Sequence, residues 1–391
     1  MPGVISRGIK APIIREGDDI VDTVVQSVYE SEREDGYTLK DRDIIAVTES
    51  VVARAQGNYA TVDQVAQDVR AKFPAKSLGL VFPILSRNRF SICLKAIARA
   101  MDEVTILFSY PNDEVGNPLM PRAAYVKHRY SEVTSFQEAE FLETFGTPRH
   151  PFTGVNYLDF YREVIESEGA KATFLFSNDC RYIASFCDQI LCCDIHTRKE
   201  TQDTLKPMCK TVLTMDDILS SSVDGSGYHE SYGLLGSNKA TEEKLKLFPR
   251  NCQPVVDGIQ ARILKDRGIH VDAMVYGDGA FKDPVGGIWE LADPVVSPAY
   301  TKGLAGQPNE LKLKYLADND FADLSGDALK EAIRKEIKSK DSDLVGSMSS
   351  EGTTPRQYTD LLGSLCDLTS GSGDKGTPFI VIQNYFTNYA E

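Results

Sequence analysis

Long apolar stretches are missing from this sequence. Nowhere in the 391 residues do about 18 consecutive apolar residues occur, which is the length that a helix needs to cross a bilayer. The opening MPGVISRGIK also lacks the apolar core of a secretion signal. We therefore expect no membrane association and a cytoplasmic location.

Positive charge is also scarce. The chain has 43 Lys and Arg residues against 57 Asp and Glu residues, which gives a formal net charge of −14. Such an acidic chain is poorly suited to the general binding of nucleic acids or anionic membranes. We expect small-molecule partners and no nucleic acid, and any bound phosphate must be held by a local site.

The eight cysteines do not form the two close pairs of a zinc motif. Only Cys193 and His196 have the CxxH spacing. Because no secretion signal is present, we do not expect a disulfide framework. Buried thiols in apolar strands are the favoured interpretation, and a metal site is the weaker alternative. The crowded stretch contains Cys180, Cys187, Cys192, Cys193 and Cys209.

What the sequence does contain is an alternation of amphipathic helices and short apolar strands. This alternation predicts an α+β fold with mixed or antiparallel sheets and helical cover. Helices are expected near residues 17–33, 61–73, 92–97, 157–167, 254–267, 326–339 and 356–368. Strands are expected at residues 44–47, 78–82, 104–108, 173–177, 272–276 and 379–385.

The alternation weakens between about 110 and 225. We therefore expect three parts. Residues 1–110 and 229–391 are the two halves of one domain, and residues 111–228 are an insertion or a second lobe.

Three loops at the ends of apolar strands could carry chemistry, because open sheets usually bind ligands at strand ends. In the first, Thr48, Glu49 and Ser50 follow a strand, and Arg54 comes about one helical turn later. A guanidinium group there could bind a phosphate. Taken alone, such a loop is more often a capped helix start with a surface arginine.

The second loop places Asp278 between Gly277 and Gly279, at the end of the strand DAMVY. The glycines would let a ligand approach the backbone. The carboxylate suits an Mg²⁺ or Mn²⁺ ion that bridges to nucleotide phosphates. An ordinary Asp-Gly turn is the alternative, and the commoner one.

The third loop is the small-residue run SGSGDKG, residues 370–376, before the last strand. Small residues leave backbone N–H groups accessible to a phosphate. The run is not a Walker motif, since neither GxxxxGK[ST] nor GxGxxG occurs in it.

The order and spacing of these loops resemble the coenzyme F-420 γ-glutamyl ligase family. GIKAPIIREGDDI looks like the start of that family, and DRDIIAVTESVVARAQG is similar to a strand and the basic segment that follows it. GLLGSN, YGDGAF and LTSGSGDKGTPFIVI resemble later motifs. The resemblance covers roughly residues 5–85 and 230–385 and implies the fold of that family.

The resemblance also implies which residues contact ligands. The metal-binding aspartates of the family fall at Asp278 and at Leu235, which cannot bind a metal, and Ser372 stands where a metal-associated glutamine is expected. Asp278 and Ser372 are therefore the expected metal positions. Candidate replacements for the missing ligands are Asp179, Glu230 and Asp283. Expected nucleotide contacts are Ile13, Glu49, Ser50, Arg54, Asn238, Ser370, Gly371, Ser372, Gly373 and Asp374.

The activity that the resemblance implies is that of a GTP- or ATP-dependent acid–amino-acid ligase that uses Mg²⁺ or Mn²⁺. It would phosphorylate the carboxylate of a small acceptor, and the amine of L-glutamate or another amino acid would displace the phosphate. Arg54 and Asp278 would be catalytic, one as a cation and the other as a metal ligand, because the developing phosphoryl charge needs cations. The resemblance also suggests a homodimer.

Two other functions remain open. Leu235 favours a nucleotide-binding regulator or scaffold that kept the fold without ligase chemistry. An unrelated α/β enzyme that uses the cysteine cluster would need a bound metal. His229 could contact a substrate, although a histidine beside a tyrosine-rich turn is more often structural.

Overall fold

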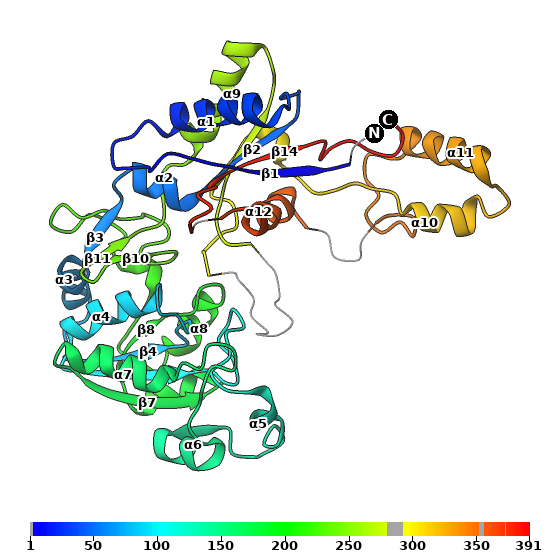
Figure 1. Ribbon diagram of the computed structural model, residues 1–391. Helices are drawn as coiled ribbons and strands as arrows, with labels where there is room; N and C mark the ends of the chain where they lie inside the picture. The colour runs from blue at the N-terminus through cyan, green and yellow to red at the C-terminus, as the bar shows by residue number, and fades with distance from the viewer. Residues whose placement is uncertain (1–2, 280–291, 352–355, 372) are drawn as a thin grey trace.

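The protein forms two layered units, each built on its own sheet (Figure 1). The computed structural model describes residues 3–279, 292–351, 356–371 and 373–391. The first unit has a five-stranded mixed sheet in the order β1-β14-β2-β12-β13. Its strands are β1 (Ile5–Ile9), β14 (Phe379–Gln383), β2 (Ile44–Thr48), β12 (Asp272–Tyr276) and β13 (Ala299–Tyr300).

Helices cover both faces of this sheet. Helices α1 (Ile20–Asp35) and α9 (Gln253–Arg267) lie on one face, and α12 (Tyr358–Thr369) lies on the other (Figure 1). Successive residues of a strand point to opposite faces. Accordingly, Ile45 packs with α1 and α9, whereas Ile44 packs with α12. This burial on both faces explains why the central strands β14, β2 and β12 are mostly apolar.

The second unit has a six-stranded sheet whose strands are all parallel except the edge strand β6. In sheet order the strands are β6 (Ser135–Gln137), β7 (Lys171–Ser177), β5 (Glu103–Phe108), β4 (Ser77–Val81), β8 (Gln189–Cys192) and β9 (Thr211–Thr214). The chain winds outward from β4 through β5 to β7, and then from β8 to β9 on the other side. The direction of winding thus reverses between β4 and β8, and loops at such a point usually bind ligands.

This sheet is also covered on both faces. Helices α3 (Val62–Lys72), α4 (Phe90–Ala100) and α7 (Tyr157–Ser167) pack on one face, and α8 (Arg198–Leu205) packs on the other. Helix α4 follows the loop after β4, so its first residues lie where the winding reverses.

A small sheet joins the two units. It has the order β10-β11-β3, with strands β10 (Asn238–Thr241), β11 (Lys244–Lys246) and β3 (Tyr59–Thr61). Strand β3 connects α2 (Glu49–Ala55) of the first unit to α3 of the second. The remaining elements are α5 (Arg122–Val126), α6 (Glu138–Phe145), α10 (Leu313–Tyr315), α11 (Gly326–Ser339), the 3₁₀ segments Cys180–Ser185, Met215–Asp217 and Lys302–Leu304, and the π-helical turn Leu316–Asp320.

The expected α+β class with mixed sheets is confirmed. The helices and strands expected from periodicity are present close to their expected bounds. The boundary expected at residue 110 falls within the second unit, because β4 and β5 hydrogen-bond with later strands rather than with β2. Within the described part of the chain, none of the helices has both the length and the apolar character needed to span a bilayer.

Candidate functional site

A cavity of about 370 Å³ lies at the ends of β2 and β12. We call it the strand-end cavity. Its walls come from residues 11–14, from the start of α2, from the end of β12 and from five residues before β14, which are Ser370, Gly371, Gly373, Gly376 and Pro378. The sequence-predicted residues that line it are Ile13, Ser50, Arg54, Ser370, Gly371 and Gly373. The fold therefore brings together residues from three widely separated parts of the chain.

Strand directions explain why these segments meet. Strands β2 and β12 are parallel, so both end at the same edge, and the antiparallel β14 begins there. The Thr48 backbone N–H donates to the Pro378 carbonyl oxygen at 3.1 Å, and the Ala11 N–H donates to the Gly376 oxygen at 3.1 Å. These bonds hold the loop before β14 against the other walls of the cavity.

Arg54 holds a neighbouring wall of this cavity and also lines the cavity. Its Nε donates to the carbonyl oxygen of Ile14 at 2.5 Å, which fixes the segment that carries Ile13. The side chain is exposed and lines the cavity. A guanidinium group has five N–H donors, so the contact with Ile14 leaves donors for a phosphate.

Glu49 does not line the strand-end cavity. It is only 5% exposed, and both of its carboxylate oxygens accept hydrogen bonds from Lys246 Nζ of β11 at 2.9 Å. Burial raises the pKa of Glu49, and the Lys246 charge opposes this effect. As the first residue of α2, Glu49 is turned toward β11 rather than toward the cavity. The geometry gives it a structural ion pair instead of the expected nucleotide contact.

Asp278 lies in a second, smaller cavity of about 150 Å³, which it lines with Ser86, Arg89 and Asn117. Its Oδ2 accepts a hydrogen bond from Arg89 Nη2 at 2.7 Å, and Arg89 Nη1 donates to Asp293 Oδ1 at 2.7 Å. Arg89 comes from the loop after β4. The second unit thus supplies a cation to the strand end that carries Asp278.

The charged groups around Arg89 are largely withdrawn from solvent: Asp293 and Glu49 are buried, and Arg89 and Asp278 are partly buried. Desolvation by burial would lower the pKa of Arg89, but Asp293, Asp278 and Glu49 outweigh it and raise the pKa. The guanidinium therefore stays charged. The cluster is completed by Lys246, which holds Glu49.

The glycines beside Asp278 serve protein contacts. A Cβ atom on Gly277 would lie 2.4 Å from Asp293 Oδ2, and one on Gly279 would lie 2.6 Å from the Ser364 Cα of α12. We expected these glycines to admit a ligand. The structure instead shows that they make room for protein atoms, because Asp293 packs against Gly277 and α12 packs against Gly279.

The side chains present do not fit an Mg²⁺ or Mn²⁺ ion held by Asp278. Its Oδ2 is bonded to the positively charged Arg89, which would repel a cation. Leu235 is buried and offers no ligand. In the described ranges, no three His, Cys, Asp or Glu side chains gather closely enough to hold an ion. Ser372 and Asp283, two further expected ligands, lie outside the described residues.

The remaining expected ligands do not line either cavity. Asn238 begins β10 and pairs with Lys246 of β11, and Asp374 is exposed in the loop before β14. Asp179 binds Arg181 at 2.7 Å, and Glu230 is exposed.

His229 has a structural setting. Its Nδ1 accepts the backbone N–H groups of Ser231 and Tyr232, each at 3.2 Å, and its ring lies 4.6 Å from the ring of Tyr232. Burial lowers the pKa of His229. The ring thus stabilises the turn before β10 in its neutral form.

The cysteine cluster lies around β8. All five thiols are free; Cys187, Cys192 and Cys193 are buried, and the other two are partly buried. Burial raises the pKa of Cys192 and of Cys193, which disfavours the reactive thiolate. His196, the other half of the CxxH spacing, is exposed.

Sequence reasoning missed three charged residues of the site: Arg89, Lys246 and Asp293. Arg89 follows an apolar strand in the run SRNRF, which is the same signal that pointed to Arg54. Lys246 interrupts the apolar run LKLF, which signals a buried charge that needs a partner. Asp293 has no comparable signal, because only the tertiary fold brings it to Arg89.

A buried carboxyl beside the smaller cavity predicts a pH effect on stability. Asp113 accepts the backbone N–H of Leu85 at 2.7 Å and that of Asn117 at 2.7 Å. Burial raises its pKa from 3.8 to about 6. Between these values the folded protein retains a proton that the unfolded chain has released. This contribution to stability is therefore present below pH 4 and is lost as the pH rises through about 6.

Replacing Asp113 with asparagine should remove that contribution, which is about 2–3 kcal/mol. We expect urea melts from pH 4 to pH 7 to show a stability difference between wild type and Asp113→Asn that changes by this amount. A difference that stays constant over this range would show that Asp113 has an ordinary pKa.

Comparison with known proteins identifies one family. A family model described as F420-0:Gamma-glutamyl ligase matches residues 8–384. No curated protein matches the chain significantly.

Proposed function

Because the chain belongs to the F420-0:γ-glutamyl ligase family, we propose that it is a nucleotide-dependent amide ligase that joins L-glutamate or another amino acid to a small carboxylic acid. Membership makes it an enzyme of the ligase type. The observation that carries the finer proposal is the strand-end cavity, in which the basic segment after β2 and the glycine-containing loop before β14 meet.

We assign GTP or ATP to the strand-end cavity. Arg54 binds a phosphate group of the nucleotide, and Ser50 and Ser370 offer hydroxyl groups to it. Gly371 and Gly373 carry no side chain that would keep a phosphate from the backbone. The apolar Ile13, which is 78% exposed, covers the base or the ribose.

The reaction proceeds through an acyl phosphate. An oxygen of the acceptor carboxylate attacks the γ-phosphorus, and the bond to the nucleoside diphosphate breaks. The amine nitrogen then attacks the acyl carbon, phosphate leaves with the C–O bond electrons, and the nitrogen releases a proton to solvent. The products are an amide, a nucleoside diphosphate and phosphate. That Mg²⁺ or Mn²⁺ accompanies the nucleotide stays a prediction.

A nucleotide-binding regulator or scaffold is the second candidate function. Leu235 favours it, because the position offers no ligand to a metal. Binding of a nucleotide without any turnover, over a broad set of acids and amino acids, would favour this second function. The expected homodimer also stays a prediction, which light scattering on the purified protein tests.

The experiment that tests the ligase is a coupled assay of nucleoside diphosphate and phosphate release. GTP or ATP is supplied with L-glutamate and a panel of small carboxylic acids, and the amide is identified by mass. We expect release that requires both the acid and the amino acid. Arg54→Ala is the matched inactive variant, and equal release by that variant would exclude the strand-end cavity as the nucleotide site.

A further inference from the structure

A charged arginine side chain, Arg89, lies at the end of β12. The Arg89 guanidinium lies between two carboxylates, with 2.7 Å to Asp278 and 2.7 Å to Asp293. The Asp293 side chain is 1% exposed and the Arg89 side chain is 17% exposed. The Asp278 backbone N–H also donates to Asp293 at 2.9 Å, so both carboxylates are fixed in place.

Among the described residues, the cluster already contains two cations for its three carboxylates. Glu49, Asp278 and Asp293 carry three negative charges, and Lys246 and Arg89 carry two positive charges. The pairs divide this charge locally: Lys246 neutralises Glu49, and Arg89 lies between the other two carboxylates. A divalent ion at Asp278 would have to displace an arginine that stays charged.

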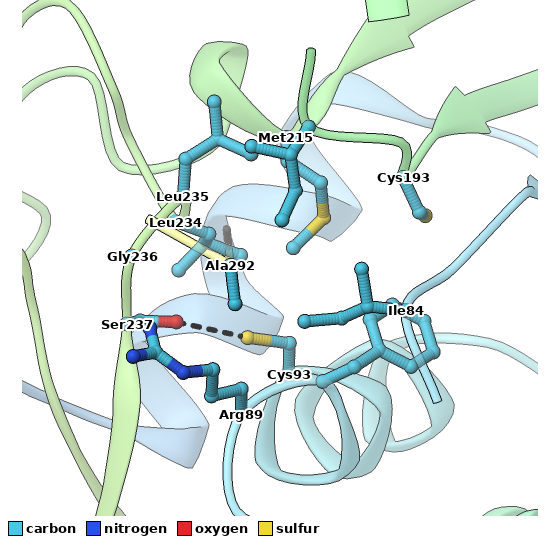
Figure 2. A pocket seen from close by; sticks show the side chains of 12 residues that line it. Ile84, Arg89, Cys93, Cys193, Met215, Leu234, Leu235, Gly236, Ser237 and Ala292 are labelled. Carbon is cyan, nitrogen blue, oxygen red and sulfur yellow. Dashed lines mark hydrogen bonds between the residues drawn. The ribbon is translucent and has the colours of Figure 1, made fainter. Parts of the chain in front are cut away.

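The other side of Arg89 is also unsuited to a metal ion. Arg89 lines a small apolar pocket together with Leu234, Leu235 and Met215 (Figure 2). Mg²⁺ and Mn²⁺ require oxygen ligands, and besides Arg89 the only polar side chains among the described residues of this pocket are Ser237, Cys93 and Cys193; the Ser237 hydroxyl is hydrogen-bonded to Cys93 Sγ at 3.2 Å. The pocket wall therefore favours the guanidinium, whose planar face tolerates apolar neighbours better than a hydrated ion does.

We propose that Arg89 takes the place of a protein-bound divalent metal ion at the end of β12 and binds the phosphoryl group that passes between the nucleotide and the acceptor. The part concerning the phosphoryl group rests on the proposed function. The part concerning the metal rests only on the charges around Asp278.

Arg89 has free donors and a suitable position for binding a phosphoryl group. Its two ion pairs use one donor on each terminal nitrogen, out of five N–H donors in a guanidinium group. Arg89 and Asp278 both line the smaller cavity. Asp278 comes two residues after Tyr276, which lines the strand-end cavity. In this proposal, the phosphate chain of a nucleotide in the strand-end cavity runs past the end of β12 toward Arg89.

The first arm of the test measures metal binding without a nucleotide, by titrating Mn²⁺ and following its electron paramagnetic resonance. We expect no stoichiometric Mn²⁺ binding by wild type and the appearance of one site in Arg89→Met, because Asp278 and Asp293 lose their cation. The added substitution Asp278→Asn should abolish that site. Stoichiometric Mn²⁺ binding by wild type that is lost in Asp278→Asn would overturn the inference.

The second arm measures the affinity for GTP and ATP by calorimetry, in EDTA and in Mn²⁺. We expect the wild-type dissociation constants in the two conditions to agree within about threefold. Arg89→Met should bind at least tenfold more weakly in EDTA and regain affinity in Mn²⁺. A wild-type loss of tenfold or more in EDTA, with Arg89→Met unchanged, would overturn the role of Arg89 toward the phosphate.

Two further variants guard against trivial explanations. If Arg89→Met fails to fold, Arg89→Lys replaces it as the test variant. Arg89→Lys keeps the positive charge, so its nucleotide affinity should be the same in EDTA and in Mn²⁺. Arg99→Met removes another ion-paired arginine of the same unit, bound to Glu168 at 2.7 Å and lining neither cavity, and should behave like wild type. Absence of nucleotide binding in every condition would refute the proposed function. The Mn²⁺ titration would still decide whether Arg89 replaces the metal ion.

Discussion

Lys246→Met should lower the free energy of unfolding by about 3–5 kcal/mol, because it leaves a buried carboxylate without its partner. Among the described residues, Lys246 is the ion-pair partner of Glu49, and the Lys246 and Glu49 side chains are 9% and 7% exposed. Urea denaturation at pH 7 measures the loss. The variant should regain stability as the pH falls, because burial raises the pKa of Glu49 and the carboxyl group can then be protonated.

Two variants control this prediction. Glu49→Gln added to Lys246→Met should recover much of the loss, since it removes the uncompensated charge. Lys239→Met, on the neighbouring strand β10, removes a lysine bound to the exposed Glu242 and should change the stability by less than about 0.5 kcal/mol. Equal losses of unfolding free energy in the two lysine variants would show that the buried pair contributes no more to stability than the exposed one.

Arg54→Ala should weaken nucleotide binding by about 1.5–3 kcal/mol, or about 10- to 150-fold in the dissociation constant. The loss has two sources. The phosphate loses a charge-assisted hydrogen bond, and the segment that carries Ile13 loses its bond from Arg54 Nε to the Ile14 carbonyl. Calorimetric titration with GTP and with ATP measures the change.

Arg15→Ala is the matched control for Arg54. Arg15 lies next to the same segment and is exposed, but it does not line the strand-end cavity. Its replacement should leave nucleotide affinity unchanged. Arg54→Lys should fall between wild type and alanine, because lysine keeps the charge and loses the planar fork. Wild-type affinity in Arg54→Ala would remove Arg54 from the site.

The sequence predicted the elements of the fold well because their patterns are local. The strands IIAVT and DAMVY are mostly apolar, and the structure buries both faces of each between helices. The region from 110 to 225 was read less clearly. Its strands β6, β8 and β9 have only three or four residues each, which is too short to show a clear period in the sequence.

Six residues that line the strand-end cavity could be predicted from the sequence: the loop patterns pointed to five of them, and the family resemblance pointed to Ile13. The charged cluster could not, because it depends on contacts between distant segments. Arg89 meets Asp278 across 189 positions, and Lys246 meets Glu49 across 197. Glu49 resembled a ligand at a strand end, yet the first turn of α2 directs it to β11. No local pattern encodes that direction.

A thermal-shift series on the purified protein tests most directly whether the strand-end cavity binds a nucleotide. GTP, ATP and GDP are each added with Mg²⁺, with Mn²⁺ and with EDTA, since a ligand that binds only the folded state must raise the melting temperature. At 100 times its dissociation constant, a triphosphate adds about 2.7 kcal/mol of stability. We expect one triphosphate to raise the melting temperature of wild type and to have a much smaller effect on Arg54→Ala. No rise with any nucleotide in any condition would refute a nucleotide-dependent ligase.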